Sequence, residues 1–260
     1  SHGTAAGIVF GESVLPMITA LKELGRGMGD AVFPPVCVNC RGLVEKSGFR
    51  HLCVKCAGQL DFVRAPHCST CGHPFYGVVE GERMCPHCEG LEPAFNSGCT
   101  AVLFKGPARA LVIELKYHRG RHVLADMEEI FRRSPEVRGK IADAVLVPVP
   151  LHPRKERERG YNQSALLAAA LARAGGPDTR VEALLRRTAD TQTQTAFDRK
   201  TRQANLKNAF ALAEGTALIA GQKYVLVDDV FTTGSTLNSC ARALRRAGAL
   251  NLDVVTFGHG

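Results

Sequence analysis

The chain has 260 residues, 45% of them hydrophobic, and its mean hydropathy is close to zero. These values are typical of a globular protein with a sizeable buried core, and they exclude a mainly disordered chain. The formal net charge of +8 favours an anionic partner, without distinguishing a nucleic acid from a phosphorylated small molecule.

The sequence also bears on location and domain number. The longest apolar runs are far shorter than the roughly 20 residues that cross a bilayer, so no membrane span is expected. The first residues lack the basic region and apolar segment of a secretory signal, and we expect a cytoplasmic protein. A domain usually has about 100–200 residues, so the length suits two.

The first predicted element is an amphipathic helix over residues 15–31. Its apolar side chains recur every third residue, at Leu15, Ile18, Leu21 and Leu24. Glycines and then two prolines end it. Residues 1–35 are therefore assigned to an N-terminal helix, and Ser1 and His2 are consistent with a tag remnant.

Residues 36–92 contain eight of the ten cysteines and little periodic apolar sequence, so this segment cannot build a hydrophobic core of its own. The eight form four Cys-x2-Cys pairs: Cys37 and Cys40, Cys53 and Cys56, Cys68 and Cys71, Cys85 and Cys88. Cysteines packed merely as small hydrophobic residues would not produce four identical spacings. Two sets of four thiolates suit two tetrahedral Zn²⁺ ions, and four sulfurs per ion leave no position for a substrate. We predict a double zinc ribbon with two structural zincs, with sequential pairing favoured over a cross-braced arrangement.

Other cysteines and histidines receive less specific interpretations. Four histidines lie near the paired cysteines and are expected to be surface residues, although one could replace a thiolate as a ligand: His51, His67, His73 and His87. Cys99 and Cys240 fall in a predicted strand and a predicted helix, so both are expected to be buried.

Residues 93–260 alternate between apolar strands and amphipathic helices. Strands are predicted at 99–104, 145–149 and 225–230. Helices are predicted at 107–117, 123–131, 165–174 and 236–247. Continuous apolar strands separated by helices predict an α/β fold, with a parallel sheet covered by helices on both faces.

The most informative stretch is VLVDDVFTTGST, from residue 225 to residue 236. A buried strand here delivers Asp228 and Asp229 to the carboxyl edge of the sheet, where open α/β folds bind ligands. The next residues can surround a phosphate with backbone amides and hydroxyls at a helix N-terminus: Thr232, Thr233, Gly234, Ser235 and Thr236. The alternative is an ordinary turn and N-cap, but two adjacent acids after a wholly apolar strand are costly without a partner.

At these residues the sequence resembles the type I phosphoribosyltransferases. The resemblance implies that Asp228 and Asp229 bind the ribose hydroxyls of phosphoribosyl pyrophosphate (PRPP), which is bound with Mg²⁺. It also implies that residues 232–236 bind the 5′-phosphate.

Three further segments, at residues 115–121, 147–164 and 184–210, resemble the ComF family of competence proteins. With the cysteines and the loop, this resemblance covers nearly the whole chain from about residue 15. It implies a double zinc ribbon joined to a phosphoribosyltransferase domain, here residues 93–260, and a link to single-stranded DNA during natural transformation. DNA-uptake or recombination proteins are expected partners.

The resemblance also implies a pyrophosphate contact in the turn over residues 151–161, and a closing loop over residues 188–205. Arg154 and Lys155 are the predicted contacts, supported by Arg186 or Arg187, and the alternative is a solvated charge run. Residues 151–210 contain twelve Lys or Arg and six Asp or Glu, a net charge of +6, which would attract pyrophosphate or a nucleic-acid backbone. Aromatic residues that could stack on bases are few in this stretch, among them Tyr161 and Phe197.

Two functions remain open at this point. The first is a DNA-uptake adaptor that binds PRPP and single-stranded DNA. The second is an enzyme that displaces pyrophosphate from PRPP, with Asp228, Asp229, Arg154 and Lys155 at the reacting centre and an unidentified acceptor. A regulator that senses PRPP is less favoured, because no helix-turn-helix is apparent.

Overall fold

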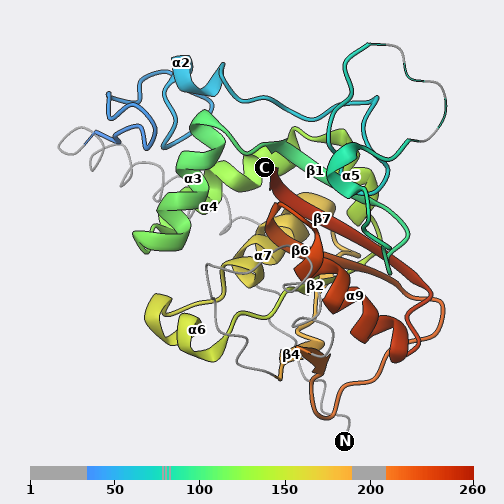
Figure 1. Cartoon of the computed structure of the whole chain (residues 1–260). Helices are drawn as coiled ribbons and strands as arrows, with labels where there is room; N and C mark the ends of the chain where they lie inside the picture. Colours follow the sequence, from blue (N-terminus) through green and yellow to red (C-terminus); the bar gives the residue numbers. More distant parts are fainter. Residues whose placement is uncertain (1–33, 78, 80, 82, 189–208) are drawn as a thin grey trace, which may run out of the picture.

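The computed structural model describes residues 34–77, 79, 81, 83–188 and 209–260 (Figure 1). The helix predicted over residues 15–31 and nearly all of the predicted closing loop lie outside them. Among the described residues, no helix combines the length and the apolar character that a membrane span requires.

Five parallel strands form the main sheet, in the order β1-β7-β6-β2-β3. They are β1 (Gly98–Leu103), β2 (Val145–Pro148), β3 (Arg180–Val181), β6 (Lys223–Phe231) and β7 (Asn251–His259). Two short strands, β4 (Leu185–Arg187) and β5 (Phe210–Leu212), pair in an antiparallel ribbon. The predicted parallel sheet is confirmed, and the three predicted strands correspond to β1, β2 and β6.

The sequence analysis missed β7, which lies between β1 and β6 near the centre of the sheet. Asp253 and Thr256 interrupt its apolar run, yet both are buried. Asp253 accepts hydrogen bonds from the backbone and the hydroxyl of Ser97, and the hydroxyls of Thr256 and Thr100 lie 2.7 Å apart. These polar residues belong in the core because residues far away in the chain satisfy them.

The four predicted helices are confirmed to within a few residues as α3, α4, α7 and α9. The helices are α2 (Val54–Ala57), α3 (Gly106–Tyr117), α4 (Leu124–Arg132), α5 (Pro135–Ile141), α6 (Pro153–Arg159), α7 (Gln163–Gly175) and α9 (Ser235–Arg246). Two 3₁₀ turns are η1 (Pro86–Cys88) and η2 (Arg121–Val123).

The stretch predicted as a turn over residues 151–161 instead contains helix α6. Pro153 occupies the first helical position, where its missing N–H costs nothing. His152 caps this end by accepting a hydrogen bond from the Arg154 N–H, and Gly160, with φ of 80°, ends the helix. The predicted cations therefore lie on a helix, which fixes the directions in which they point.

Both faces of the sheet are buried, because successive side chains of a strand point to opposite faces. Leu146, Val225 and Val227 pack in a first core with α3, α4, α5 and α7. Val147 and Leu226 pack in a second core with α9, β4 and β5.

The cysteine-rich segment is divided between these two cores. Its first half packs in the first core, and the blue segment beside α3 in Figure 1 belongs to it. Its second half packs in the second core. Between the halves, Phe62 pairs with Val102 of β1, and the Val63 N–H donates to the Ala101 carbonyl. The segment thus obtains its apolar packing from the α/β region.

Candidate functional site

Two groups of four cysteines each bring their sulfurs within 4.8 Å of one another. The first is Cys37, Cys40, Cys53 and Cys56, and the second is Cys68, Cys71, Cys85 and Cys88. This confirms the sequential pairing and excludes the cross-braced arrangement. Four thiolates at this spacing fit a structural zinc ion, and the fit leaves no open coordination position.

The two clusters share a local backbone geometry. In each cluster, the backbone carbonyl of the first cysteine accepts a hydrogen bond from the N–H of the residue four positions later. The N–H of Arg41 donates to Cys37, and the N–H of Gly72 donates to Cys68. Arg41 and Gly72 both have positive φ, of 64° and 78°. A Cβ on Gly72 would lie 2.6 Å from the Thr100 backbone nitrogen, so the second turn requires glycine.

The neighbouring histidines, which we predicted to be surface residues, are exposed to different extents. His87 is exposed, whereas His51, His67 and His73 are partly buried. The ring of His73 packs against those of His87 and His259, with centroids 4.6 and 4.9 Å away. His259, the penultimate residue, was not singled out from the sequence, yet its Nε2 lies 3.2 Å from the sulfur of Cys71. The buried location predicted for Cys99 and Cys240 is confirmed.

The two adjacent acids lie near the carboxyl end of β6. Asp228 Oδ1 accepts hydrogen bonds from the hydroxyl of Ser164 at 2.8 Å and from the backbone N–H of Asp229 at 2.9 Å. Asp229 Oδ1 pairs with Nζ of Lys116, from the end of α3, at 2.8 Å. Burial and the charge of Asp229 raise the pKa of Asp228 to about 7, although Ser164 and Lys116 oppose the shift.

The loop after β6 places Gly234 immediately before α9, with φ of 69°. The hydroxyls of Thr233 and Ser235 lie 2.9 Å apart, and Thr232 is exposed. Phe231 and Leu91 enclose Gly234, since a Cβ there would lie 2.5 Å from the Phe231 ring. The positive end of the helix dipole and these hydroxyls form an arrangement that suits a phosphate group.

The two predicted pyrophosphate contacts have different surroundings. Both side chains are exposed, and Arg154 is paired with Glu158 at 2.9 Å. Desolvation and the positive charges of Arg159, Arg187 and Lys116 lower the pKa of Lys155. Lys155 thus belongs to a group of cations that includes the partner of Asp229, and an anion would relieve their repulsion.

Comparison with known proteins follows the same division of the chain. The sequence matches the models of a double zinc ribbon domain over residues 28–89 and a phosphoribosyl transferase domain over residues 164–258. Competence protein F of Haemophilus influenzae is 30% identical over 228 residues, which are 84% of this chain and 94% of that protein. The chain belongs to the ComF family.

Further ComF relatives are similar over most of their length. DNA utilization protein YhgH of Escherichia coli K12 is 32% identical, with 72% of this chain and 81% of that protein covered. Competence protein ComFC of Bacillus subtilis is 24% identical, with 76% and 79% covered. A solved hypoxanthine phosphoribosyltransferase from Staphylococcus aureus overlaps 51% of this chain at 14% identity, with a TM-score of 0.32.

Three residues of this ComF protein's site were missed as site residues by sequence reasoning. Lys116 and Ser164 contact the paired acids from α3 and α7, and His259 contacts a cysteine of the second cluster. Lys116 and Ser164 both fall within the segments that resemble the family, which is the signal that could have identified them. His259 had no such signal.

Proposed function

We propose that this ComF-family protein binds PRPP with Mg²⁺ at the carboxyl edge of its sheet. We also propose that it handles single-stranded DNA on an adjoining basic surface during natural transformation. Competence and DNA utilization are the roles named for its relatives, and a phosphoribosyl ligand is what its second domain suggests.

The observation that carries the ligand proposal is the pair of acids directly ahead of the loop, of which Asp229 is buried. Among the described residues, Asp229 Oδ2 is buried and has no hydrogen-bond partner. A buried carboxylate oxygen without a donor costs on the order of 1–3 kcal/mol, which a hydroxyl of a bound ribose would offset. The adjacent loop supplies hydroxyls and a helix N-terminus for the 5′-phosphate.

For the pyrophosphate, the surroundings favour Lys155 over Arg154. Lys155 lies among cations, with Arg187 from β4 and Lys116 from α3 nearby, whereas Arg154 is paired with Glu158. Mg²⁺ bound to the ligand's phosphates would reduce the same excess of charge. We therefore assign Lys155 the main pyrophosphate contact and Arg154 a secondary one.

The basic surface proposed for DNA comprises Arg154, Lys155, Arg157, Arg159, Arg186 and Arg187, together with Arg199, Lys200 and Arg202, which lie outside the described residues. Arg119 and Arg121 extend it, because they donate to the carbonyls of Glu158 and Gly160 around the end of α6. Tyr117 adds an exposed aromatic ring, over which the Arg159 guanidinium lies at 5.5 Å. Cations interleaved with aromatic rings suit a nucleic-acid backbone and its bases.

Titration calorimetry with PRPP and Mg²⁺ tests the ligand proposal. Replacing Asp228 and Asp229 together by Asn should weaken binding at least about tenfold, which corresponds to loss of about 1.4 kcal/mol of hydrogen bonding. Asp178→Asn, at an exposed acid away from the site, is the control. Equal affinity of the double variant and the wild type would rule out this site.

A salt series tests the DNA proposal. Affinity for single-stranded DNA should fall with a log–log slope of about −0.7 per neutralised phosphate. Reversing Arg154 and Lys155 to Glu should weaken both DNA and PRPP binding. If cysteine-cluster variants lost DNA binding while these reversals kept it, the ribbons would be the DNA surface.

The second candidate function is phosphoribosyl transfer. The Lys155 cation group beside the paired acids favours it, because such cations can stabilise departing pyrophosphate. Pyrophosphate release from PRPP, measured across a panel of nucleobase and amine acceptors, separates an enzyme from a PRPP-binding adaptor.

A further inference from the structure

Lys116 reaches the paired acids from a different element of the fold, and its pairing with Asp229 is not explained by the fold alone. It extends from the last turn of α3 to Asp229, and the two side chains are 21% and 6% exposed. The preceding carbonyl, of Leu115, accepts a hydrogen bond from the buried hydroxyl of Tyr161. This bond fixes the end of α3 against the segment that follows α6, so the backbone from which Lys116 extends is held in place.

The ion pair is incomplete in a way that points to a ligand. Lys116 occupies Oδ1 of Asp229, while Oδ2 is buried without a partner among the described residues. Asp228, by contrast, has one oxygen held by two donors. If this ion pair served only to join α3 to the sheet, the second carboxylate oxygen should also accept a hydrogen bond. Without that bond, the cost of removing the carboxylate from water offsets the attraction between the two charges.

Electrostatics gives Lys116 a second effect on the acids. Two adjacent carboxylates repel each other, which favours a proton on one of them. Burial and the charge of Asp229 raise the pKa of Asp228 to about 7, and the positive charge of Lys116 limits this rise. The groups that face the pair are Lys116 from α3, Ser164 from α7 and the thiol of Cys240 from α9, whose pKa burial raises well above its usual range.

We propose that Lys116 is a positioning residue for the phosphoribosyl ligand: it orients Asp229 so that Oδ2 accepts a hydrogen bond from a ribose hydroxyl. This inference rests on the proposed function and adds a residue to the same site. Lys116 would act through Asp229 and would not touch the reacting atoms.

The test compares Lys116→Met, Lys116→Arg and the wild type by titration calorimetry with PRPP and Mg²⁺, from pH 5.5 to pH 8.5. A proton on Asp228 would remove an acceptor for the ribose, so affinity falls as the pH drops through the pKa of Asp228, about 7. Lys116→Met should raise that pKa, move the midpoint up by about one unit and weaken binding at pH 7 by at least about fivefold. Lys116→Arg should stay within about threefold of the wild type. Comparing proteins at each pH cancels the titration of the ligand.

Lys140→Met is the matched control. Lys140 is similarly half-buried, and its Nζ lies 3.7 Å from Asp253 of the same sheet, so it reports the cost of losing such a pair away from the acids. It should leave the PRPP midpoint unchanged. An unchanged midpoint in Lys116→Met, or an equal affinity loss in Lys140→Met, would overturn the inference while the proposed function stood. Failure of the wild type to bind PRPP would overturn both.

Discussion

The two cysteine clusters share their residue spacing but differ in what they support. In the first, Cys40 is exposed, whereas all four cysteines of the second are buried. The first cluster packs in the core formed with α3, α4 and α7. The second packs in the core that contains α9, next to the loop at residues 232–236. Similar local motifs therefore have different consequences, set by the face of the sheet on which each lies.

Two polar contacts add to the apolar packing of the first cluster on α4. The buried carboxylate of Asp126 accepts hydrogen bonds from the backbone N–H groups of Arg50 and His51, at 2.8 and 2.7 Å. The guanidinium of Arg133 lies over the ring of Phe49, 4.5 Å from its centroid. These contacts lie away from the paired acids, so the first cluster is expected to affect stability more than binding.

The second cluster is connected directly to the loop. Nε2 of His259 lies 3.2 Å from the Cys71 sulfur, and the His259 ring stacks on Phe231, with centroids 5.5 Å apart and an interplanar angle of 11°. Phe231 in turn encloses Gly234 together with Leu91, which follows the last cysteine of the cluster. Phe231 and Gly234 thus take their positions partly from the second cluster.

The largest expected effect separates the clusters by removing one thiolate from each. Cys71→Ser and Cys40→Ser should each lose about one zinc per chain by elemental analysis, because three thiolates bind the ion far more weakly. Cys71→Ser should also lower PRPP affinity by at least tenfold in calorimetry, whereas Cys40→Ser should change it by less than about threefold. Equal losses of affinity would show that the two clusters support the loop alike.

A smaller effect is expected from Asp126→Ala, which removes the acceptor for two N–H groups of the first cluster. Each unsatisfied N–H costs about 1–3 kcal/mol, so the unfolding free energy should fall by about 2–4 kcal/mol with little change in PRPP affinity. Chemical denaturation at fixed zinc concentration measures the first quantity. A loss of PRPP affinity as large as that of Cys71→Ser would contradict the separation.

Asp126 also predicts a dependence on pH. Burial raises the pKa of Asp126 despite the hydrogen bonds from Arg50 and His51, so the folded state binds its proton more tightly than the unfolded state. The contribution of this group to stability therefore rises as the pH falls from neutral toward the raised pKa. Asp126→Asn should lack this rise. The unfolding free energy of the wild type minus that of the variant should therefore increase between pH 7 and pH 5.

Gly234→Ala tests the packing between the second cluster and the loop. The left-handed backbone and contact with the Phe231 ring should together cost about 1–3 kcal/mol and weaken PRPP binding. The control is Gly215→Ala, because Gly215 has nearly the same φ, 73°, but nothing within 4 Å of an added Cβ. If both variants lost equal stability, the backbone alone would account for the cost and the contact with Phe231 would be immaterial.

The sequence predicted features that depend on neighbouring residues and missed those that depend on distant ones. The cysteine clusters and the loop after β6 are contiguous patterns, and their spacing alone identifies the chemistry. β7 was missed because buried Asp253 and Thr256 have their partners, Ser97 and Thr100, far away in the chain. Lys116 was missed for the same reason, since only the fold brings the end of α3 to Asp229.

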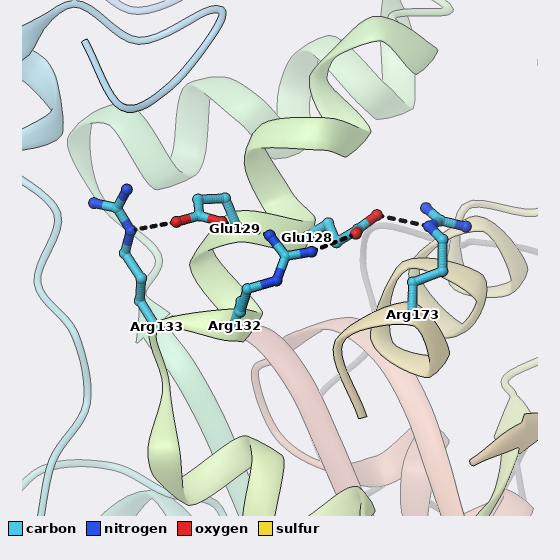
Figure 2. A network of polar contacts seen from close by, with 5 residues as sticks. All are labelled: Glu128, Glu129, Arg132, Arg133 and Arg173. Atoms are coloured by element: carbon cyan, nitrogen blue, oxygen red, sulfur yellow. Dashed lines mark hydrogen bonds and ion pairs between the residues drawn. The ribbon is translucent and has the colours of Figure 1, made fainter. Parts of the chain in front are cut away.

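The smallest expected effect concerns the ion-pair network that runs along α4 and reaches α7 (Figure 2). Glu128 pairs with Arg132 and Arg173, and Glu129 pairs with Arg132 and Arg133, at distances of 2.6 to 2.8 Å. Exposed pairs of this kind contribute about 0–1 kcal/mol each and weaken as salt rises.

Arg133 of this network also covers the ring of Phe49, which lies in the chain between the two Cys-x2-Cys pairs of the first cluster. A cation–π contact at a partly exposed site adds about 0.5–1 kcal/mol. Part of this comes from packing of the guanidinium on the ring, which salt does not screen. Arg133→Ala should therefore lower the unfolding free energy by about 1 kcal/mol, and part of that loss should persist in 1 M salt. Arg173→Ala, which breaks an equally short pair without touching the cluster, should cost less than about 0.5 kcal/mol and nothing in 1 M salt. Equal and fully salt-sensitive losses would mean that the network joins only the helices and that the contact of Arg133 with Phe49 adds nothing to the attachment of the first cluster to α4.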